Sequence, residues 1–166
     1  VLAKLPSSIP VKGCGVTLAN DKILIFGGAH YFQATDKVTM YDITKNEFKE
    51  LAPLPYKVCH MATVKYEGNV ILACGSDENC CSNTNVMNTI VKYDIETQKS
   101  TTVPPVKQKR SQCCAIVDGH SLVVMGGKTQ NGDPVNLVRK TDLRSRSWES
   151  LPSMKTARGA FIAAVV

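Results

Sequence analysis

The chain is short of aromatic residues and of long apolar stretches, and both shortages narrow the classes to which it can belong. Phe, Trp and Tyr make up 6% of its 166 residues, with a single tryptophan. No apolar run approaches the roughly 18 residues that a membrane-spanning helix requires. Hydrophobic residues at 43% and charged residues at 20% describe an ordinary globular protein. We therefore expect no membrane association.

Recognisable catalytic motifs are missing as well. The sequence contains no Gly-x-Ser-x-Gly pattern, phosphate-binding loop or His-Glu-x-x-His pattern. Its histidines, His30, His60 and His120, have no repeated carboxylate or serine near them. For His60, which precedes a predicted strand, we expect a structural role. The sequence thus predicts a protein without catalytic residues and without a cofactor.

The seven cysteines do not form a metal or disulfide pattern. Their number is odd, their spacing is irregular, and the chain has no Asn-x-Ser/Thr glycosylation site. Cys80 and Cys81 are adjacent, whereas structural zinc sites use spaced Cys-x-x-Cys or Cys/His sets, so we expect no metal. These features favour reduced thiols in the cytoplasm or nucleus. Cys80 and Cys81, in the longest predicted loop, are the cysteines expected to be exposed and oxidisable.

What the chain does contain is a threefold repeat with a period of about 50 residues, which indicates a repeat architecture. Apolar runs that end on glycine occupy residues 23–28, 70–75 and 122–127. Each run is apolar at consecutive positions, which is typical of a strand buried on both faces. The glycine at the end of the strand allows positive φ in the loop that follows.

Further marks follow each run in a constant order. An aspartate preceded by Tyr or Thr comes first, a residue that is aromatic in two repeats stands six positions later, and a Leu-Pro or Pro-Pro pair comes last. The three sets are Tyr41-Asp42 with Phe48, Tyr93-Asp94 with Ser100, and Thr141-Asp142 with Trp148. This order resembles the kelch repeat over essentially the whole chain. Cys74, Ser100 and Thr141 depart from the family pattern.

The resemblance implies an all-β fold, a partial kelch-type β-propeller. Each repeat divides into four short antiparallel strands, and no long stretch has helical periodicity. We expect three blades, at residues 11–51, 58–103 and 110–151, with 1–6 ending a preceding blade and 158–166 beginning a following one. Because propellers have roughly 4–8 blades, the chain is expected to be a piece of a larger propeller. Each repeat's aspartate should accept hydrogen bonds from turn amides, and Phe48 and Trp148 should pack between blades.

The strand order assigns the loops to two faces. Short turns, at residues 20–21, 67–69 and 118–120, fall on one face together with the hairpin loops. Longer and more varied loops share the other face with the connections between blades; they are residues 29–36, 76–88 and 128–134. Binding residues concentrate in varied loops on rigid scaffolds, so we expect the partner on this second face.

Positive charge is concentrated in the second half of the chain. The net charge is +6, and residues 84–166 carry 12 basic against 6 acidic side chains, while residues 1–83 carry 8 of each. Part of the excess lies in residues 107–110 and 139–140. The first explanation of such an excess is a solvated surface, and the second is an acidic protein partner. Nucleic acid ranks third, because no aromatic residue interleaves with the basic runs.

Two arginines occupy matching points of successive repeats, just before a first strand. They are Arg110 and Arg158. The resemblance implies that arginines in this connection contact acidic partner segments, for which a guanidinium is suited by its permanent charge and two-pronged geometry. The alternative is that each arginine only ties its own loop through backbone carbonyls. Around them we add four further candidate residues, whose loop positions give them no evident packing role: His30, Tyr31, Phe32 and Gln130.

Resemblance to the kelch-like proteins implies a protein-interaction module. The specific version is a substrate adaptor of a cullin-type ubiquitin ligase, in which a BTB domain upstream binds the cullin and the propeller holds the substrate. An actin-binding or cytoskeletal kelch protein is the alternative within the same class. A propeller enzyme is the alternative of a different class. A BTB domain upstream of Val1 would support the adaptor.

Overall fold

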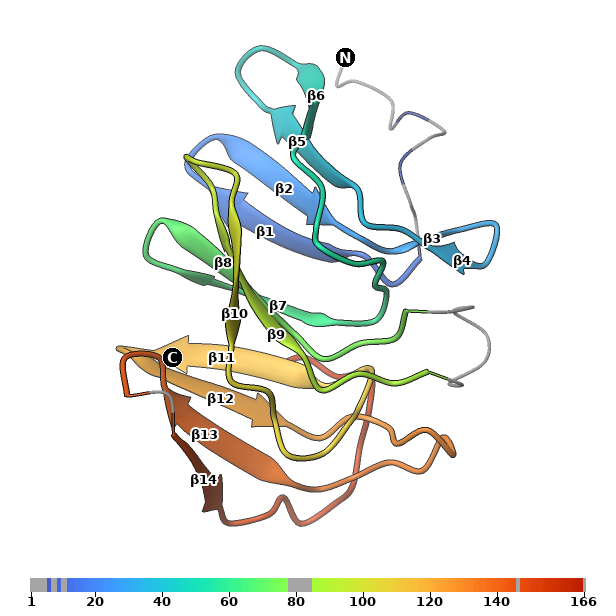
Figure 1. The fold of residues 1–166 in the computed structure, drawn as a ribbon, viewed down its shortest axis with the longest axis vertical. Helices are drawn as coiled ribbons and strands as arrows, with labels where there is room; N and C mark the ends of the chain where they lie inside the picture. The colour runs from blue at the N-terminus through green and yellow to red at the C-terminus, as the bar shows by residue number, and fades with distance from the viewer. Residues whose placement is uncertain (1–5, 7–8, 10–11, 78–84, 146, 166) are drawn as a thin grey trace.

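The computed structural model describes residues 6, 9, 12–77, 85–145 and 147–165, and the strands in these ranges form three four-stranded sheets and one small hairpin (Figure 1). Blade 1 consists of β1 (Gly15–Ala19), β2 (Lys22–Phe26), β5 (Val38–Asp42) and β6 (Glu47–Leu51). Blade 2 consists of β7 (Ala62–Tyr66), β8 (Asn69–Ala73), β9 (Ile90–Asp94) and β10 (Ser100–Val103). Blade 3 consists of β11 (Cys114–Asp118), β12 (Ser121–Met125), β13 (Val138–Asp142) and β14 (Trp148–Leu151).

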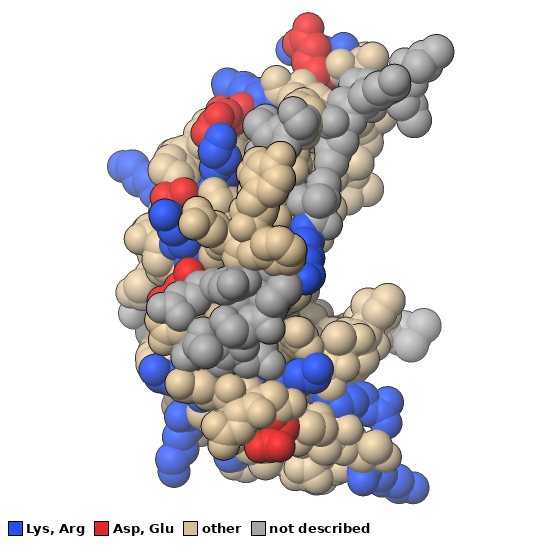
Figure 2. Space-filling model, turned by 90° about the vertical axis from the view of Figure 1, so that its right-hand side faces the viewer, with Lys and Arg blue, Asp and Glu red and all other residues tan. Residues whose placement is uncertain are grey.

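All pairings within the blades are antiparallel between strands that follow one another in the blade. The first strands, β1, β7 and β11, contact one another in sequence and line one edge of the array. Figure 2, turned by 90° from Figure 1, shows the resulting crescent. The predicted all-β, partial propeller is confirmed. No described segment forms a helix, so none is long and apolar enough to cross a membrane.

The consecutive apolar runs are explained by burial on both sides of each blade. In β8, Val70 and Leu72 face the cluster shared with blade 1, whereas Ile71 and Ala73 face the cluster shared with blade 3. Fully burying one such side chain stabilises the fold by about 1.5–3 kcal/mol. The middle blade is therefore held by its two neighbours, and its own hydrogen bonds only set the register.

Aromatic residues pack in these clusters between blades. The Phe26 and Tyr93 rings meet edge to face, with their centroids 5.3 Å apart, between blades 1 and 2. Trp148 packs against the cluster between blades 2 and 3, and its Nε1 donates a 2.9 Å hydrogen bond to the Pro104 carbonyl. Phe48 instead lies beside Tyr41 in its own blade, with centroids 4.7 Å apart. The expected packing against a neighbouring blade is thus seen for Trp148, while Phe48 contacts its cross-strand neighbour.

The repeated aspartates hold the hairpin turns as expected. Asp42 accepts hydrogen bonds from the Thr44 hydroxyl (2.7 Å) and from the Thr44 and Lys45 amides, and Asp94 accepts one of 2.7 Å from the Thr97 amide. Asp142 accepts the Arg144 amide at 2.7 Å. These hydrogen bonds lower the pKa of all three carboxyl groups below the ordinary aspartate value. The repeat motif therefore encodes a turn, and its carboxylate is already occupied.

Backbone hydrogen bonds link the blades along their inner edge. The His60 amide donates to the Gly13 carbonyl (2.7 Å), Gln112 to His60 (2.8 Å), and Ala160 to Gln112 (2.8 Å). All four residues have positive φ, between 53° and 64°. Residues 156–165 form no strand, and the expected start of a following blade at residues 158–166 stays a prediction. A strand needs a paired ladder, and the adjacent described residues supply only isolated bonds to this segment.

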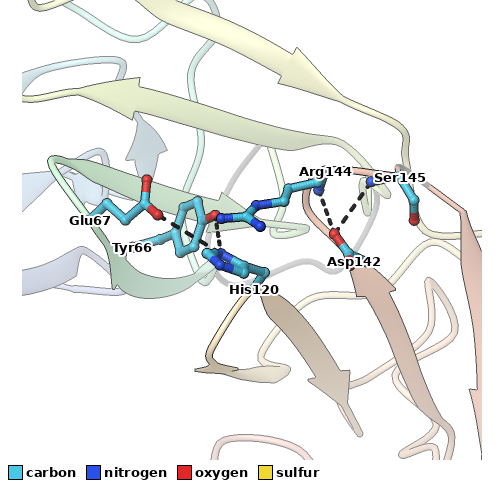
Figure 3. A network of polar contacts seen from close by, with 6 residues as sticks. All are labelled: Tyr66, Glu67, His120, Asp142, Arg144 and Ser145. Atoms are coloured by element: carbon cyan, nitrogen blue, oxygen red, sulfur yellow. Dashed lines mark hydrogen bonds and ion pairs between the residues drawn. The ribbon is translucent and has the colours of Figure 1, made fainter.

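A polar cluster joins blades 2 and 3 at their short turns (Figure 3). Tyr66, at the end of β7, places its hydroxyl 2.8 Å from His120 Nδ1, in the turn between β11 and β12. Glu67 Oε1 lies 3.8 Å from the same nitrogen. Asp142, with its Arg144 and Ser145 amide donors, lies next to this group. His120 therefore acts as a contact between blades.

Candidate partner-binding face

The two faces of the array differ as the strand order predicts. In Figure 1 the short turns lie on the left and the longer connections on the right. We call the right-hand side the long-loop face; its loops comprise residues 27–37, 74–89 and 126–137 with the connections 52–61, 104–113 and 152–161. Figure 2 looks onto this face. Residues 78–84, which include Cys80 and Cys81, lie outside the described residues.

The most exposed aromatic residues of the described chain stand on this face. Strands β3 (Ala29–His30) and β4 (Gln33–Ala34) form a hairpin whose two turn residues are Tyr31 and Phe32. Both have positive φ, 45° and 69°, and their exposed fractions are 85% and 56%. The His30 ring lies edge to face with Tyr31, centroids 4.3 Å apart, and Lys12 Nζ lies 5.7 Å from the Phe32 ring centre. Three of the predicted site residues are thus neighbours at one hairpin tip.

Arg110 does not reach the surface. Its side chain is fully buried between blades 2 and 3, where Nη1 donates to the Gly126 carbonyl at 3.2 Å and to the Leu137 carbonyl at 3.4 Å. Burial lowers the pKa of this guanidinium, and the nearby charge of Arg139 lowers it further. Its Nη1 bonds tie Arg110 to the loop between β12 and β13, and only its Nε, 3.5 Å from the Gln108 carbonyl, ties its own connection as the alternative expects. Direct contact between Arg110 and a partner is incompatible with this packing.

The other two predicted residues are exposed. Arg158 repeats the local geometry of Arg110, because its Nε lies 3.5 Å from the Thr156 carbonyl just as Arg110 Nε lies 3.5 Å from that of Gln108. Its side chain is exposed in the described structure. Gln130 is exposed in the loop between β12 and β13. The prediction of a partner contact therefore stays open for both.

A pocket between blades 2 and 3 collects basic side chains that sequence reasoning did not bring together. We call it the Arg139 pocket; its volume is about 260 Å³ and its lining residues are Val106, Lys107, Arg139, Trp148, Glu149 and Ser150. Arg139 faces Ser150 across the β13–β14 ladder. Its Nε is buried without a hydrogen-bond partner among the described residues. Glu149 is the only carboxylate in the lining, and its Oε1 lies 3.2 Å from Nζ of Lys140, a residue that does not line the pocket.

Positive charge surrounds this pocket both in its lining and in the buried residue behind it. Lys107 and Arg139 line it, and Arg110 is buried close enough to Arg139 for their charges to oppose each other. In Figure 2, lysine and arginine side chains gather in the lower part of the long-loop face, where blade 3 lies. Buried charge acts in a lower dielectric than water, so its field is less screened. The arrangement can attract a compact anion.

A second hollow lies beside the β3–β4 hairpin. Its volume is about 450 Å³, and it is lined by His30, Gln33, Ala34, Thr35, Asp36, Lys37 and Lys57. Both lysines are exposed. A partner that covers the hairpin would therefore also meet a surface with more positive than negative side chains.

Most of the described cysteines are buried free thiols. Cys59, Cys74, Cys113 and Cys114 are buried free thiols, and Cys14 is half-buried. A hydrogen bond to Cys113, together with burial, raises the pKa of Cys74. Within the described ranges, no three His, Cys, Asp or Glu side chains are grouped for a metal ion.

Sequence reasoning missed the Arg139 pocket for a definite reason. Lys107 and Arg139 were both noted in the basic excess, but they lie 32 positions apart and meet only through the packing of two blades. The signal that was available is alternation along β13, because Arg139 and Thr141 share a face and Thr141 is buried. A register for β13 against β14 was needed to use it.

Comparisons with known proteins agree with the repeat. A kelch motif model matches residues 109–155. The chain is 25% identical to kelch-like protein 40 of Xenopus tropicalis and 25% identical to kelch-like protein 23 of Homo sapiens, in matches that cover 96% and 93% of this chain. They cover 27% and 28% of those relatives, so the chain spans little more than a quarter of their length.

Solved structures show the same fold. The structure of YjhT superposes with a TM-score of 0.77 at 13% sequence identity, over 89% of this chain and 53% of that one. At this identity the likeness concerns the fold alone. Three four-stranded blades with a recurring glycine and aspartate, a kelch motif in the third blade and kelch-like relatives over nearly the whole length make this chain similar to kelch-repeat propellers, and among them it resembles the kelch-like proteins.

Proposed function

We propose that this chain is a protein-interaction module whose long-loop face binds an acidic segment of a partner protein. The observation that carries the proposal is the Arg139 pocket, in which Lys107 and Arg139 face one carboxylate that already lies against Lys140. Protein surfaces ordinarily intersperse charges of both signs, so a pocket with surplus cations favours an anionic group. Trp148 supplies an apolar wall for the aliphatic part of a Glu or Asp side chain.

The exposed predicted residues extend this surface. Arg158 and Gln130 belong to loops around blade 3, while His30, Tyr31 and Phe32 belong to the hairpin on blade 1. Arg110 contributes from behind the pocket through its charge and through the position of the connection that it ties. The proposed site is therefore a face with a basic end and an aromatic end.

A finer form of the proposal concerns the whole protein. Resemblance to the kelch-like proteins supports a substrate-recognition propeller of a cullin-type ubiquitin ligase adaptor, acting in the cytoplasm. One relative, from Horsepox virus, is named kelch repeat and BTB domain-containing protein 2; it is 23% identical, and 75% of this chain matches 22% of it. A BTB domain encoded upstream of Val1, and cullin recovered with the full-length protein, would support this form. Full-length protein that has no BTB domain and recovers no cullin would contradict it.

The binding proposal can be tested with a fluorescently labelled Glu-rich peptide and purified chain. We expect the variant that combines Lys107→Ala with Arg139→Ala to bind the peptide at least tenfold more weakly, because both cations that line the pocket are lost. The matched control combines Lys49→Ala with Lys99→Ala, which removes two exposed charges away from the pocket. Equal affinity of the two double variants would overturn the proposal, since net charge alone would then explain binding.

A further inference from the structure

The β3–β4 hairpin carries backbone strain that the blade does not require. Among described non-glycine residues with positive φ, those outside the hairpin occupy positions that recur from blade to blade. Asn20 and Glu67 share the first turn, Asn46 and Gln98 share the hairpin loop, and Cys74 matches Gly27 and Gly126. His60, Gln112 and Ala160 share the inner edge. Tyr31 and Phe32 alone belong to no recurring position.

The residue types at the hairpin turn are also unusual. A two-residue hairpin with positive φ at both central positions is the type I′ geometry, which favours Asn-Gly, Asp-Gly or Gly-Gly. Bulky aromatic side chains are disfavoured there, because a side chain at positive φ crowds the following carbonyl. Strain of this kind persists where surrounding structure enforces it, and it concentrates at ligand-binding and functional sites.

The surrounding structure does enforce it. Ala29 and Ala34, at the base of the hairpin, are buried with Cys59 in a small cluster. The Ala29 amide donates to the Lys12 carbonyl at 2.8 Å, and the Thr35 amide donates to the Gly28 carbonyl at 2.9 Å. The base is therefore held in place while the tip projects: Tyr31 exposes 85% of its surface. Rigid aromatic side chains bind at low entropic cost, because they have few rotatable bonds to order.

The surroundings of the tip indicate what it fits. Lys12 lies over the Phe32 ring, and Lys37 and Lys57 line the adjacent hollow, where Asp36 is the only acidic lining residue. Exposed aromatic rings gain most from an apolar pocket, in which water is excluded around them. The charges of Lys12, Lys37 and Lys57 around such a contact would be complemented by carboxylates on the partner.

From these observations we infer that the Tyr31–Phe32 turn is a preformed prong that inserts into an apolar pocket with an acidic rim on a partner protein. This inference rests on the proposed interaction function and adds to it a second contact at the opposite end of the face. The basic Arg139 pocket binds an anionic segment of the partner, whereas the prong inserts into a pocket of the partner. Binding would retain the positive φ values at the tip. Because the backbone there is already ordered before binding, the entropic cost of forming the contact is lower.

The test is a turn replacement that should improve the fold and impair binding. In the variant that combines Tyr31→Asn with Phe32→Gly, the turn gains the residues that its geometry favours, so we expect Tm to rise by about 3 °C or more. We expect affinity for the partner to fall at least tenfold. Asn20→Gly is the control, because it relieves a positive φ on the short-turn face without removing an aromatic side chain, and it should leave affinity unchanged.

The partner is found with a photo-cross-linking benzoylphenylalanine at position 31, and its affinity is then measured with purified proteins. A cross-linked peptide with apolar residues flanked by Asp or Glu supports the inference. A lower Tm for the double variant would overturn it, since the aromatic pair would then have a structural role. Unchanged affinity, no cross-link at position 31, or a cross-link to a second copy of this chain would also overturn it. Unchanged affinity in that variant combined with weak binding by the Lys107/Arg139 variant would leave the interaction function intact.

Discussion

The two faces of the array differ in how far their turns and loops recur from blade to blade. On the short-turn face, matching residues of different blades have the same backbone conformation: φ is 55° at Asn20, 52° at Glu67 and 56° at Gly119. The aspartate that ends each third strand holds its turn by accepting hydrogen bonds from backbone amides. On the long-loop face the loops differ in each blade, from a strained aromatic hairpin to a loop that exposes Gln130.

This difference separates stability from recognition. A turn that recurs with three different sequences is set by the geometry of the blade, so its side chains mainly cap and link. Loops that differ are free of that requirement: one of them presents the prong, and the connection after β10 supplies Val106 and Lys107 to the Arg139 pocket, whose other lining residues lie on β13 and β14. Substitutions of buried residues between the blades and of residues on the short-turn face should therefore change unfolding, and substitutions of exposed residues on the long-loop face should change binding.

The largest effect that would sharpen this comparison is expected for a pair of phenylalanines six positions apart. Phe26 is fully buried against Tyr93, whereas Phe32 exposes 56% of its surface. We expect Phe26→Ala to cost about 3–5 kcal/mol of unfolding free energy, because it leaves a cavity between blades. Phe32→Ala should change it by no more than about 0.5 kcal/mol. Urea denaturation measures both, and similar losses would break the distinction.

A second pair tests the same repeat position in two settings. Arg110→Ala removes the donor to the Gly126 and Leu137 carbonyls and should cost about 2 kcal/mol, because buried acceptors lose a charged partner. Arg158→Ala, on an exposed side chain, should change the unfolding free energy by no more than about 0.5 kcal/mol. In binding assays we expect the reverse order: Arg158→Ala should weaken partner binding directly, and Arg110→Ala should do so less. If Arg158→Ala destabilised the fold as much as Arg110→Ala, Arg158 would be a structural tie as well.

The smallest effect concerns the short-turn face in acid. The pKa of Asp94 is lowered in the folded chain by its turn amides, so its ionised form stabilises the fold above about pH 4, the ordinary aspartate value, and this contribution is lost as pH falls through the folded pKa. Asp94→Asn lacks that titration. Between pH 6 and pH 3, its Tm should fall less steeply than that of the unaltered chain. Parallel melting curves would show that the carboxylate charge has no part in holding the turn.

Much of the fold was predictable because its signals are local. The apolar run at residues 70–73 must be covered on two sides, and alternation within β8 then distributes Val70 and Ile71 to different neighbours. Asp42, Asp94 and Asp142 have the same turn partners that their spacing predicts. Such features depend on residues a few positions apart, which a sequence displays directly.

The site was less predictable because it depends on packing between blades. An arginine just before a first strand looks the same in both repeats, yet Arg110 is covered by blade 3 and Arg158 is not covered within the described chain. Tyr31 and Phe32 are exposed in the structure, but their positive φ values follow from a two-residue turn that no local sequence pattern predicts. Whether these residues contact a partner stays a prediction.

The hydrogen bonds along the inner edge have a consequence for how this kind of chain can diverge. They run from backbone to backbone, and the position they use is filled by glycine at 13, histidine at 60, glutamine at 112 and alanine at 160. Four different residue types in one molecule occupy the same joining position. A substitution there leaves the backbone hydrogen bonds in place where the new residue accepts positive φ and fits beside its neighbours, as a Cβ at position 13 would have to fit beside the His60 ring. Propellers of this kind can therefore lose much of their sequence likeness while the order of their blades persists.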